Sequence, residues 1–198
     1  MRGKVKIAMG ALLLTLAASD VRAQVWDSPF LASPRPAPGL GLFLVDLAGA
    51  GVGAMVTWLP SATSWGFRGG IAERRDDGLV LFGGADVSAA LTRASSEMPL
   101  DIDAVLGVGA AVGEDFIISV PVGLSLGHTF TGDGATFTPY ATPRVVLDAR
   151  FDDNDDNDNL NLDFVVDLGL DLRIQPGWMI RFGGTIGDRE AIAIGIVF

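Results

Sequence analysis

Hydrophobic and polar positions alternate along most of this chain. Between Leu160 and Ile174 every even-numbered position is apolar, whereas the odd-numbered positions hold asparagine, aspartate, glycine, arginine and a single valine. The segment 100–113 repeats this scheme, with apolar residues at the even positions and aspartate followed by mostly small residues at the odd ones. A repeat of two places alternate side chains on opposite faces of a β-strand, and a helix cannot separate residues in this way. The pattern therefore predicts a β protein.

The same alternation divides the chain into ten candidate strands joined by short links. We expect them at residues 40–47, 50–59, 64–73, 79–91, 100–113, 115–128, 136–150, 160–174, 177–186 and 190–198. Closed bacterial barrels made of one chain have an even number of antiparallel strands. The predicted fold is therefore all-β: a closed antiparallel up-and-down transmembrane β-barrel of about ten strands, with eight strands as the alternative.

Alternation alone does not decide whether the apolar face points into a soluble barrel or outward to lipid. Several strands are expected to exceed the roughly 5 or 6 residues usual in soluble sheets, and roughly 9 to 11 tilted residues span a bilayer. Glycines also fall on the less apolar face, where the crowded interior of a narrow barrel needs small residues: Gly107, Gly109, Gly123, Gly127, Gly183 and Gly195. We therefore expect the apolar side chains to face lipid; a soluble periplasmic barrel that binds an apolar ligand is the alternative.

The first 23 residues have the layout of a secretory signal peptide. Basic residues at positions 2, 4 and 6 precede an apolar run over 7–18, and Val21-Arg22-Ala23 follows, which predicts release after Ala23. The apolar run is too short for the roughly 20 residues of a membrane anchor helix.

Residues 24–39 form a distinct segment between this peptide and the first strand. Four prolines, at positions 29, 34, 36 and 38, prevent a regular hydrogen-bond ladder, so we expect an extended leader on the periplasmic side. The predicted organisation is a signal peptide over 1–23, a proline-rich leader over 24–39 and a barrel over 40–198.

Composition narrows the function classes. Without residues 1–23 the chain has 10 basic and 23 acidic residues, a formal charge of −13, so nucleic acid is not an expected partner. Both lysines lie in the signal peptide, so all other basic residues are arginines. Arginine binds carboxylates through a planar, bidentate guanidinium group, which would favour arginine over lysine in a barrel interior; a GC-rich genome would produce the same preference for arginine. The absence of cysteine excludes disulfides, thiol nucleophiles and thiolate zinc sites.

Aromatic residues gather at strand ends that a ten-strand topology places on the periplasmic side. Phe130 and Tyr140 lie at this end, and a membrane-interface girdle is predicted from Trp58, Trp65, Phe137, Trp178 and Phe198.

The last strand ends on Phe198 after alternating Ile192, Ile194 and Ile196. This ending resembles the closing strand of bacterial outer-membrane β-barrels. The resemblance covers 40–198 and implies a monomeric or loosely associated barrel in the outer membrane, in contact with membrane lipid and lipopolysaccharide. It also implies delivery by periplasmic chaperones and folding by the barrel assembly machinery.

The polar face of the strands would line the barrel interior with both signs of charge. The residues expected there are Arg68, Asp86, Asp101, Asp103, Tyr140, Arg144, Asp148, Arg150, Asp163, Asp167, Asp171, Arg173 and Arg181. Buried charges persist when they are paired, so a closed interior filled with salt bridges is the first interpretation. A narrow pore for ions or small solutes, with a weak preference for cations, is the alternative.

The run 152–159 consists only of aspartate and asparagine. Asp152, Asn154 and Asp156 have the spacing of the first three calcium ligands of an EF-hand, but Asn157 replaces the turn glycine. A solvated acidic loop is the simpler interpretation, with weak calcium binding as the alternative; no other cofactor is expected.

His128 is the single histidine, so a hydrolase with a histidine base would have to use it. Lipid A deacylases and omptin proteases are small barrels that resemble this chain in size, but His128 lacks a serine two positions later and lies at the periplasmic end. We therefore expect no enzymatic activity and a role in envelope structure or surface properties. A lipid-modifying outer-membrane enzyme remains a further alternative.

Overall fold

The structure is a computed structural model that describes residues 25–47, 51–61, 63–73, 78–113, 116–132, 134–151 and 159–198. A short 3-10 helix, η1 (Val25–Asp27), precedes the strands. The strands are β1 (Gly39–Asp46), β2 (Val52–Leu59), β3 (Trp65–Glu73), β4 (Leu79–Thr92), β5 (Asp101–Val112), β6 (Phe116–Gly127), β7 (Phe130–Gly132), β8 (Ala135–Phe151), β9 (Asn159–Gln175), β10 (Trp178–Gly187) and β11 (Ala191–Val197).

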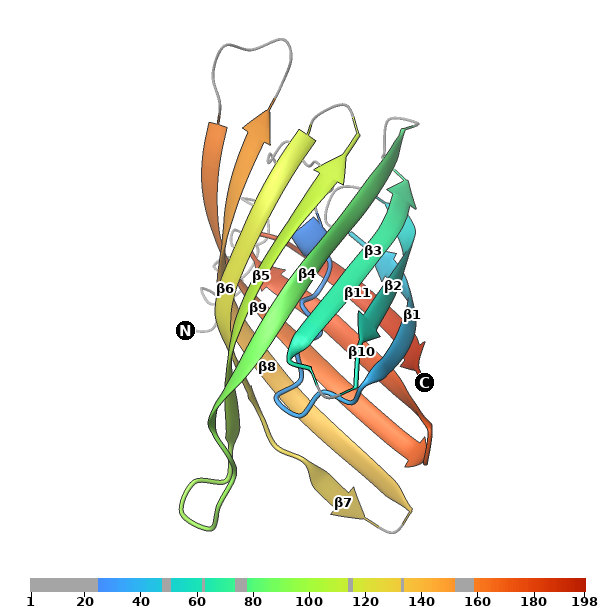
Figure 1. Cartoon of the computed structure of the whole chain (residues 1–198), viewed down its shortest axis with the longest axis vertical. Helices are drawn as coiled ribbons and strands as arrows, with labels where there is room; N and C mark the ends of the chain where they lie inside the picture. Colours follow the sequence, from blue (N-terminus) through green and yellow to red (C-terminus); the bar gives the residue numbers. More distant parts are fainter. Residues whose placement is uncertain are drawn as a thin grey trace, which may run out of the picture.

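Strands that follow one another in the chain pair in antiparallel ladders, except for β6 and β7, and two further pairings close the barrel (Figure 1). β1 pairs with β11, from Gly41 opposite Val197 to Asp46 opposite Ile192. β6 pairs with β8, from Phe116 opposite Phe151 to Gly127 opposite Tyr140. Over the described residues ten strands thus form a closed antiparallel barrel, which confirms the predicted fold class.

β7 is an addition that the alternation did not predict. Its three residues pair only with the start of β8, across a turn in which Gly134 has a φ of 86°. This positive φ suits glycine because it has no side chain to clash. The small hairpin lies below the barrel wall in Figure 1, at the end where β1 begins.

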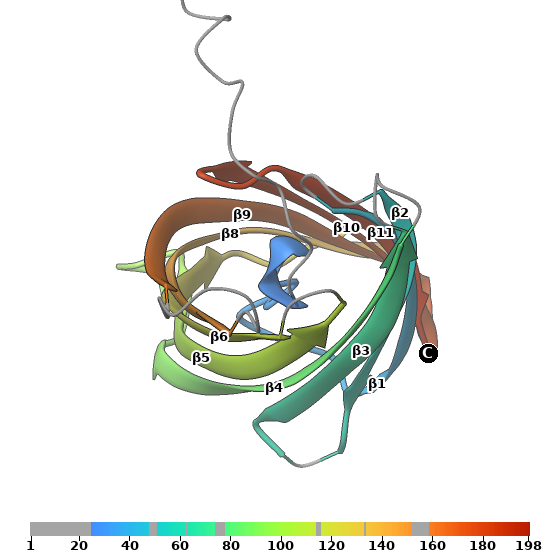
Figure 2. The same ribbon diagram turned by 90° about the horizontal axis from the view of Figure 1, so that it is seen from above.

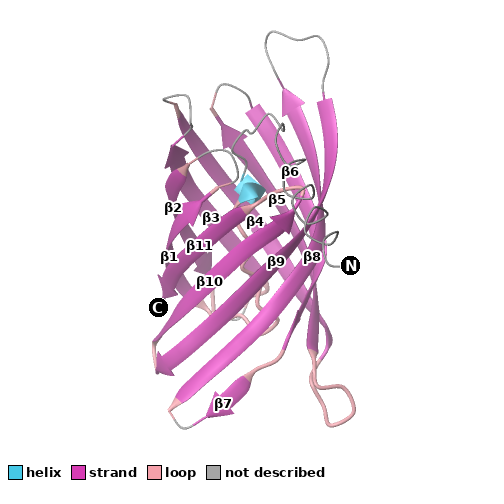
Figure 3. Cartoon of the chain, turned by 180° about the vertical axis from the view of Figure 1, so that it is seen from behind, coloured by secondary structure: helices cyan, strands magenta, loops and turns pink. Residues whose placement is uncertain are grey.

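The barrel wall is uneven in height. β8 and β9 have 17 residues each, whereas β11 has seven, so the β8–β9 pair extends beyond its neighbours at the end opposite the C-terminus (Figure 3). None of the described helical residues forms a helix long and apolar enough to span a bilayer.

The two faces of the wall have opposite polarity. Leu162, Leu168 and Ile194 point outward and are 52%, 50% and 45% exposed, whereas Asp167 and Arg181 point inward and are 1% and 7% exposed. An apolar exterior around a polar interior is the arrangement of a transmembrane β-barrel and the reverse of a soluble one. The outward direction of the apolar face, which was inferred from strand length and glycine placement, is confirmed.

The proline-rich segment differs from the extended periplasmic leader that we expected. Residues 25–38, called the plug below, run through the interior of the barrel, where Figure 2 shows η1 enclosed by the strands. Trp26, Phe30 and Leu31 are buried there. The segment does not pair as a strand, as expected from its prolines, but its backbone carbonyl groups accept hydrogen bonds from side chains of the barrel wall. The predicted signal peptide lies outside the described residues.

Candidate functional site

The candidate site is the interior of the barrel, where ion pairs join neighbouring strands. Arg144 on β8 donates from Nε and Nη2 to the two carboxylate oxygens of Asp167 on β9, at 2.6 and 3.1 Å. Thr185 on β10 donates its hydroxyl to the same carboxylate at 2.6 Å. Both side chains of the ion pair are almost fully buried. The pair is bidentate, and the carboxylate has a third donor, so the cost of burying the two charges is offset.

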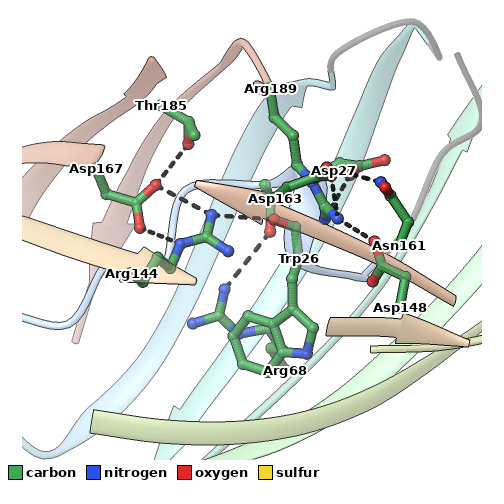
Figure 4. A network of polar contacts seen from close by, with 11 residues as sticks. Trp26, Asp27, Arg68, Arg144, Asp148, Asn161, Asp163, Asp167, Thr185 and Arg189 are labelled. Carbon is green, nitrogen blue, oxygen red and sulfur yellow. Dashed lines mark hydrogen bonds and ion pairs between the residues drawn. The ribbon is translucent and has the colours of Figure 1, made fainter. Parts of the chain in front are cut away.

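The same arginine also binds the plug. Nη2 of Arg144 donates to the backbone carbonyl oxygen of Trp26 at 3.0 Å (Figure 4). A guanidinium group has five N–H donors in a planar fork, so it can hold a wall carboxylate and a plug carbonyl together.

Two further wall arginines repeat this double contact. Arg181 on β10 donates to both carboxylate oxygens of Asp171, at 2.6 and 2.7 Å, and to the carbonyl of Leu31 at 3.1 Å. Arg93 follows β4 and donates to Asp103 on β5 and to the carbonyl of Pro34, the latter at 3.0 Å. The wall therefore supplies the donors that the plug backbone cannot obtain from a β-ladder.

Arg68 on β3 uses its guanidinium group mainly for the plug. It donates to the carbonyl oxygens of Pro29, at 3.1 Å, and of Phe30, and its nearest carboxylate is Asp86 at 3.6 Å. The Arg68 guanidinium carbon also lies 4.2 Å from the ring centroid of Trp26, a cation–π contact (Figure 4).

An ion pair anchors each end of the plug. Arg189, just before β11, donates to Asp27 of the plug at 3.0 Å, to Asp163 at 2.8 Å and to Asp148. At the other end Arg35 of the plug donates to both carboxylate oxygens of Asp101, at 2.7 and 2.9 Å. The hydrogen bond to Asp101 raises the pKa of Arg35, so this guanidinium stays charged.

The apolar side chains of the plug fit against glycines of the wall. Trp26 stacks on Phe30 with 4.7 Å between ring centroids, and a side chain at Gly107 on β5 would come within 2.6 Å of the Trp26 ring. Leu31 occupies the space over Gly183 on β10. Leu31 has a φ of 55°, which is strained for a bulky residue, and its carbonyl is held by Arg181.

Most of the interior residues expected from the alternation do lie inside the barrel. The structure buries Arg68, Asp101, Asp103, Tyr140, Arg144, Asp148, Asp167, Asp171 and Arg181, and leaves Asp86, Arg150 and Asp163 partly buried. Arg173 differs, because it lies at the end of β9 and is exposed.

Four charged residues of the network were missed by the sequence reasoning. Arg189 shares its odd position number with the inward-facing Ala191 and Ala193, so starting the last expected strand one residue earlier, at 189 instead of 190, would have found it. Asp27, Arg35 and Arg93 lie in segments without alternation, and no local pattern marks them.

The residues of the predicted girdle lie at the end of the barrel where β1 begins. Trp58, Trp65, Phe137 and Phe198 are exposed there, and Trp178 is partly buried. Trp58 stacks on Phe67 with 5.7 Å between centroids. Tyr140, which was expected both at this end and among the interior residues, is buried inside the barrel.

Two further predictions concern metal binding and the histidine. The candidate calcium ligands Asp152, Asn154 and Asp156 lie outside the described residues. In the part of the chain that is described, no group of three or more acidic residues or histidines is placed to hold a metal ion. His128 packs edge-on against Phe130, with 4.6 Å between ring centroids.

Comparisons with known proteins leave the function open. No family model matches the chain, and neither does any curated protein. Among solved structures, a chain described as "De novo design of transmembrane beta-barrels" is 15% identical and covers 83% of this chain and 97% of its own length, with a TM-score of 0.35. This likeness is too low to inform the function, which has to be argued from the geometry.

Proposed function

We propose that this protein is a non-enzymatic integral outer-membrane β-barrel with a closed interior, and that it contributes to envelope structure or surface properties. The observation that carries the proposal is the polarity of the wall: leucine and isoleucine face outward around the barrel, and paired arginine and aspartate face inward. Such an exterior would aggregate in water, whereas lipid solvates it.

The closed interior is supported by the plug. Its segment from Trp26 to Pro34 is largely buried, and wall residues bind its carbonyl groups along most of that length. A freely open pore would need this space for water and ions. We therefore propose that the intact protein does not conduct ions.

Placement in the outer membrane is supported by the sequence. The predicted signal peptide would carry the chain across the inner membrane, and the alternation of Ile192, Ile194 and Ile196 in the last strand resembles that of bacterial outer-membrane barrels. The expected partners are therefore membrane lipid, lipopolysaccharide, periplasmic chaperones and the barrel assembly machinery.

The lack of enzymatic activity is also part of the proposal. His128 lies beside an aromatic ring near the β7 end of the barrel, and none of its described contacts is a carboxylate or a serine. A histidine base needs such a partner to orient it and to activate a nucleophile. Hydrolysis of labelled lipid A by the purified protein would overturn this part.

Fractionation of cells that express the chain, followed by gel electrophoresis with and without boiling, tests the main proposal. We expect the protein in the outer-membrane fraction and a shift in mobility on boiling, because closed barrels stay folded in cold detergent. Extraction into buffer without detergent would refute the proposal and support a soluble barrel.

A further inference from the structure

We propose that the plug is an autoinhibitory element, and that its displacement converts the barrel into a water-filled channel for small ions. This inference rests on the proposed function, because it requires a barrel that spans a membrane. It adds that the wall can conduct ions once the plug is displaced, and that residues 25–38 control this conduction.

The first argument is that the barrel closes without the plug. The ladders between β1 and β11 and between β6 and β8 complete the wall, and the plug contributes no strand to them. The wall contacts the plug through side chains, which donate to plug carbonyl groups and to Asp27. Removing the plug would therefore leave every ladder hydrogen bond in place.

The second argument is that the vacated interior would stay charged and hydrated. Arg144 with Asp167 and Arg181 with Asp171 are pairs within the wall, so they persist when the plug leaves. Each arginine would lose only one carbonyl acceptor, which water can replace. Because wall ion pairs attract water, the interior would fill with solvent, and ions of either sign would find countercharges there.

The third argument is that the plug joins the wall at the rim of the barrel, beside an open space. Pro36 and Pro38 stiffen its last residues, and Gly39 follows with a φ of 153°, which favours glycine. A cavity of about 400 Å³ lies beside this exit, lined by Arg35, Trp178 and other residues. Solvent reaches the anchor at this end more readily than the other, because the side chain of Arg35 is about half exposed and that of Arg189 is buried.

Because Trp26 packs against Gly107, a substitution at either position can displace the plug without shortening the chain. Gly107→Leu would fill the space that the Trp26 ring occupies, and Trp26→Ala would remove the anchor from the other side. Gly184→Leu is the matched control, because Gly184 faces outward and a side chain there meets only the Ala191 carbonyl at 3.7 Å.

The test measures the conductance of the four full-length proteins, refolded and inserted into planar phosphatidylcholine bilayers in potassium chloride. Boiled and unboiled gels first establish that each barrel is closed. We expect no conductance from wild type and Gly184→Leu, and channel openings at least about tenfold more frequent in both plug variants. Loss of the packed Trp26 side chain should shift the equilibrium from the seated to the displaced plug by more than this factor. A synthetic peptide with the sequence of residues 25–38 should reduce the conductance of the Trp26→Ala variant.

Folded plug variants that remain as silent as wild type would overturn the inference, since the wall itself would then close the interior. Equal conductance of wild type and both variants would also overturn it, because the plug would not be the barrier. The proposed function has a separate failure: a wild-type protein without a heat-dependent shift is not a closed membrane barrel. If Gly107→Leu does not fold, Trp26→Ala alone decides the outcome.

Discussion

Tyr140 and Gly169 are direct partners across β8 and β9, and the phenol ring of Tyr140 fills the space that a side chain at position 169 would need. The same relationship joins Trp26 to Gly107 and Leu31 to Gly183, in both cases between the plug and the wall. Glycines on the inner face therefore mark the places where large side chains approach the backbone closely.

Replacement of Gly169 by alanine should destabilise the barrel. The new Cβ would overlap the ring of Tyr140, and overpacking of this kind costs about 1–3 kcal/mol. Urea unfolding of the protein in lipid vesicles measures the change. Gly184→Ala is the control, since its Cβ has room, and it should be at least as stable as wild type. Equal stability of the two variants would show that the ring does not press on Gly169.

The ion pairs of Arg144 and Arg93 should differ in their effect on stability. Both arginines bind one aspartate and one plug carbonyl, but the side chain of Arg144 is fully buried and that of Arg93 is 45% exposed. Arg144→Met leaves Asp167 buried without its cation and should cost about 3–5 kcal/mol. Arg93→Met also leaves a buried aspartate, Asp103, but water reaches the half-exposed Arg93 position, so the loss should be smaller, about 1–3 kcal/mol. Unfolding in urea compares them, and similar losses would contradict the difference in burial.

Arginine on the outer face should reveal where the lipid lies. Leu168 is near the middle of β9 and Leu160 near its start, and both side chains point outward. Leu168→Arg should destabilise the folded protein by about 2–4 kcal/mol and Leu160→Arg by about 0–1 kcal/mol, since the cost falls toward the membrane interface. Folding titrations in lipid vesicles measure both values. A small loss at Leu168 would argue against a bilayer around the wall.

Fluorescence of single tryptophans should distinguish the plug from the girdle. The chain has four tryptophans, and Trp26 is fully buried whereas Trp58 is 52% exposed. In variants with only one tryptophan, Trp58 should be quenched by lipids brominated near the headgroup. Trp26 should be quenched neither by these lipids nor by acrylamide in the buffer. Strong acrylamide quenching of Trp26 would place the plug outside the interior.

The wall of the barrel could be predicted from the sequence, because each strand is encoded by its own alternation. The strand expected at 160–174 is found as Asn159–Gln175, and the inward parity of Asp167, Asp171 and Arg181 follows from it. Alternation is a local property, so it needs no knowledge of the partner strand. It also predicted that opposite charges would meet inside, although not which arginine binds which aspartate.

The filling of the barrel interior could not be predicted in this way and depends on contacts between distant segments. Trp26 and Phe30 lie in a proline-rich segment without periodicity, and nothing local distinguishes them from residues of an exposed leader. Their burial depends on donors and glycines supplied by distant strands: Arg144 reaches the carbonyl of Trp26 across 118 positions of sequence, and Arg181 reaches that of Leu31 across 150. Such contacts exist only once the strands have closed into a barrel. A segment that forms no hydrogen-bond ladder of its own is most stable where other residues can hydrogen-bond to its backbone.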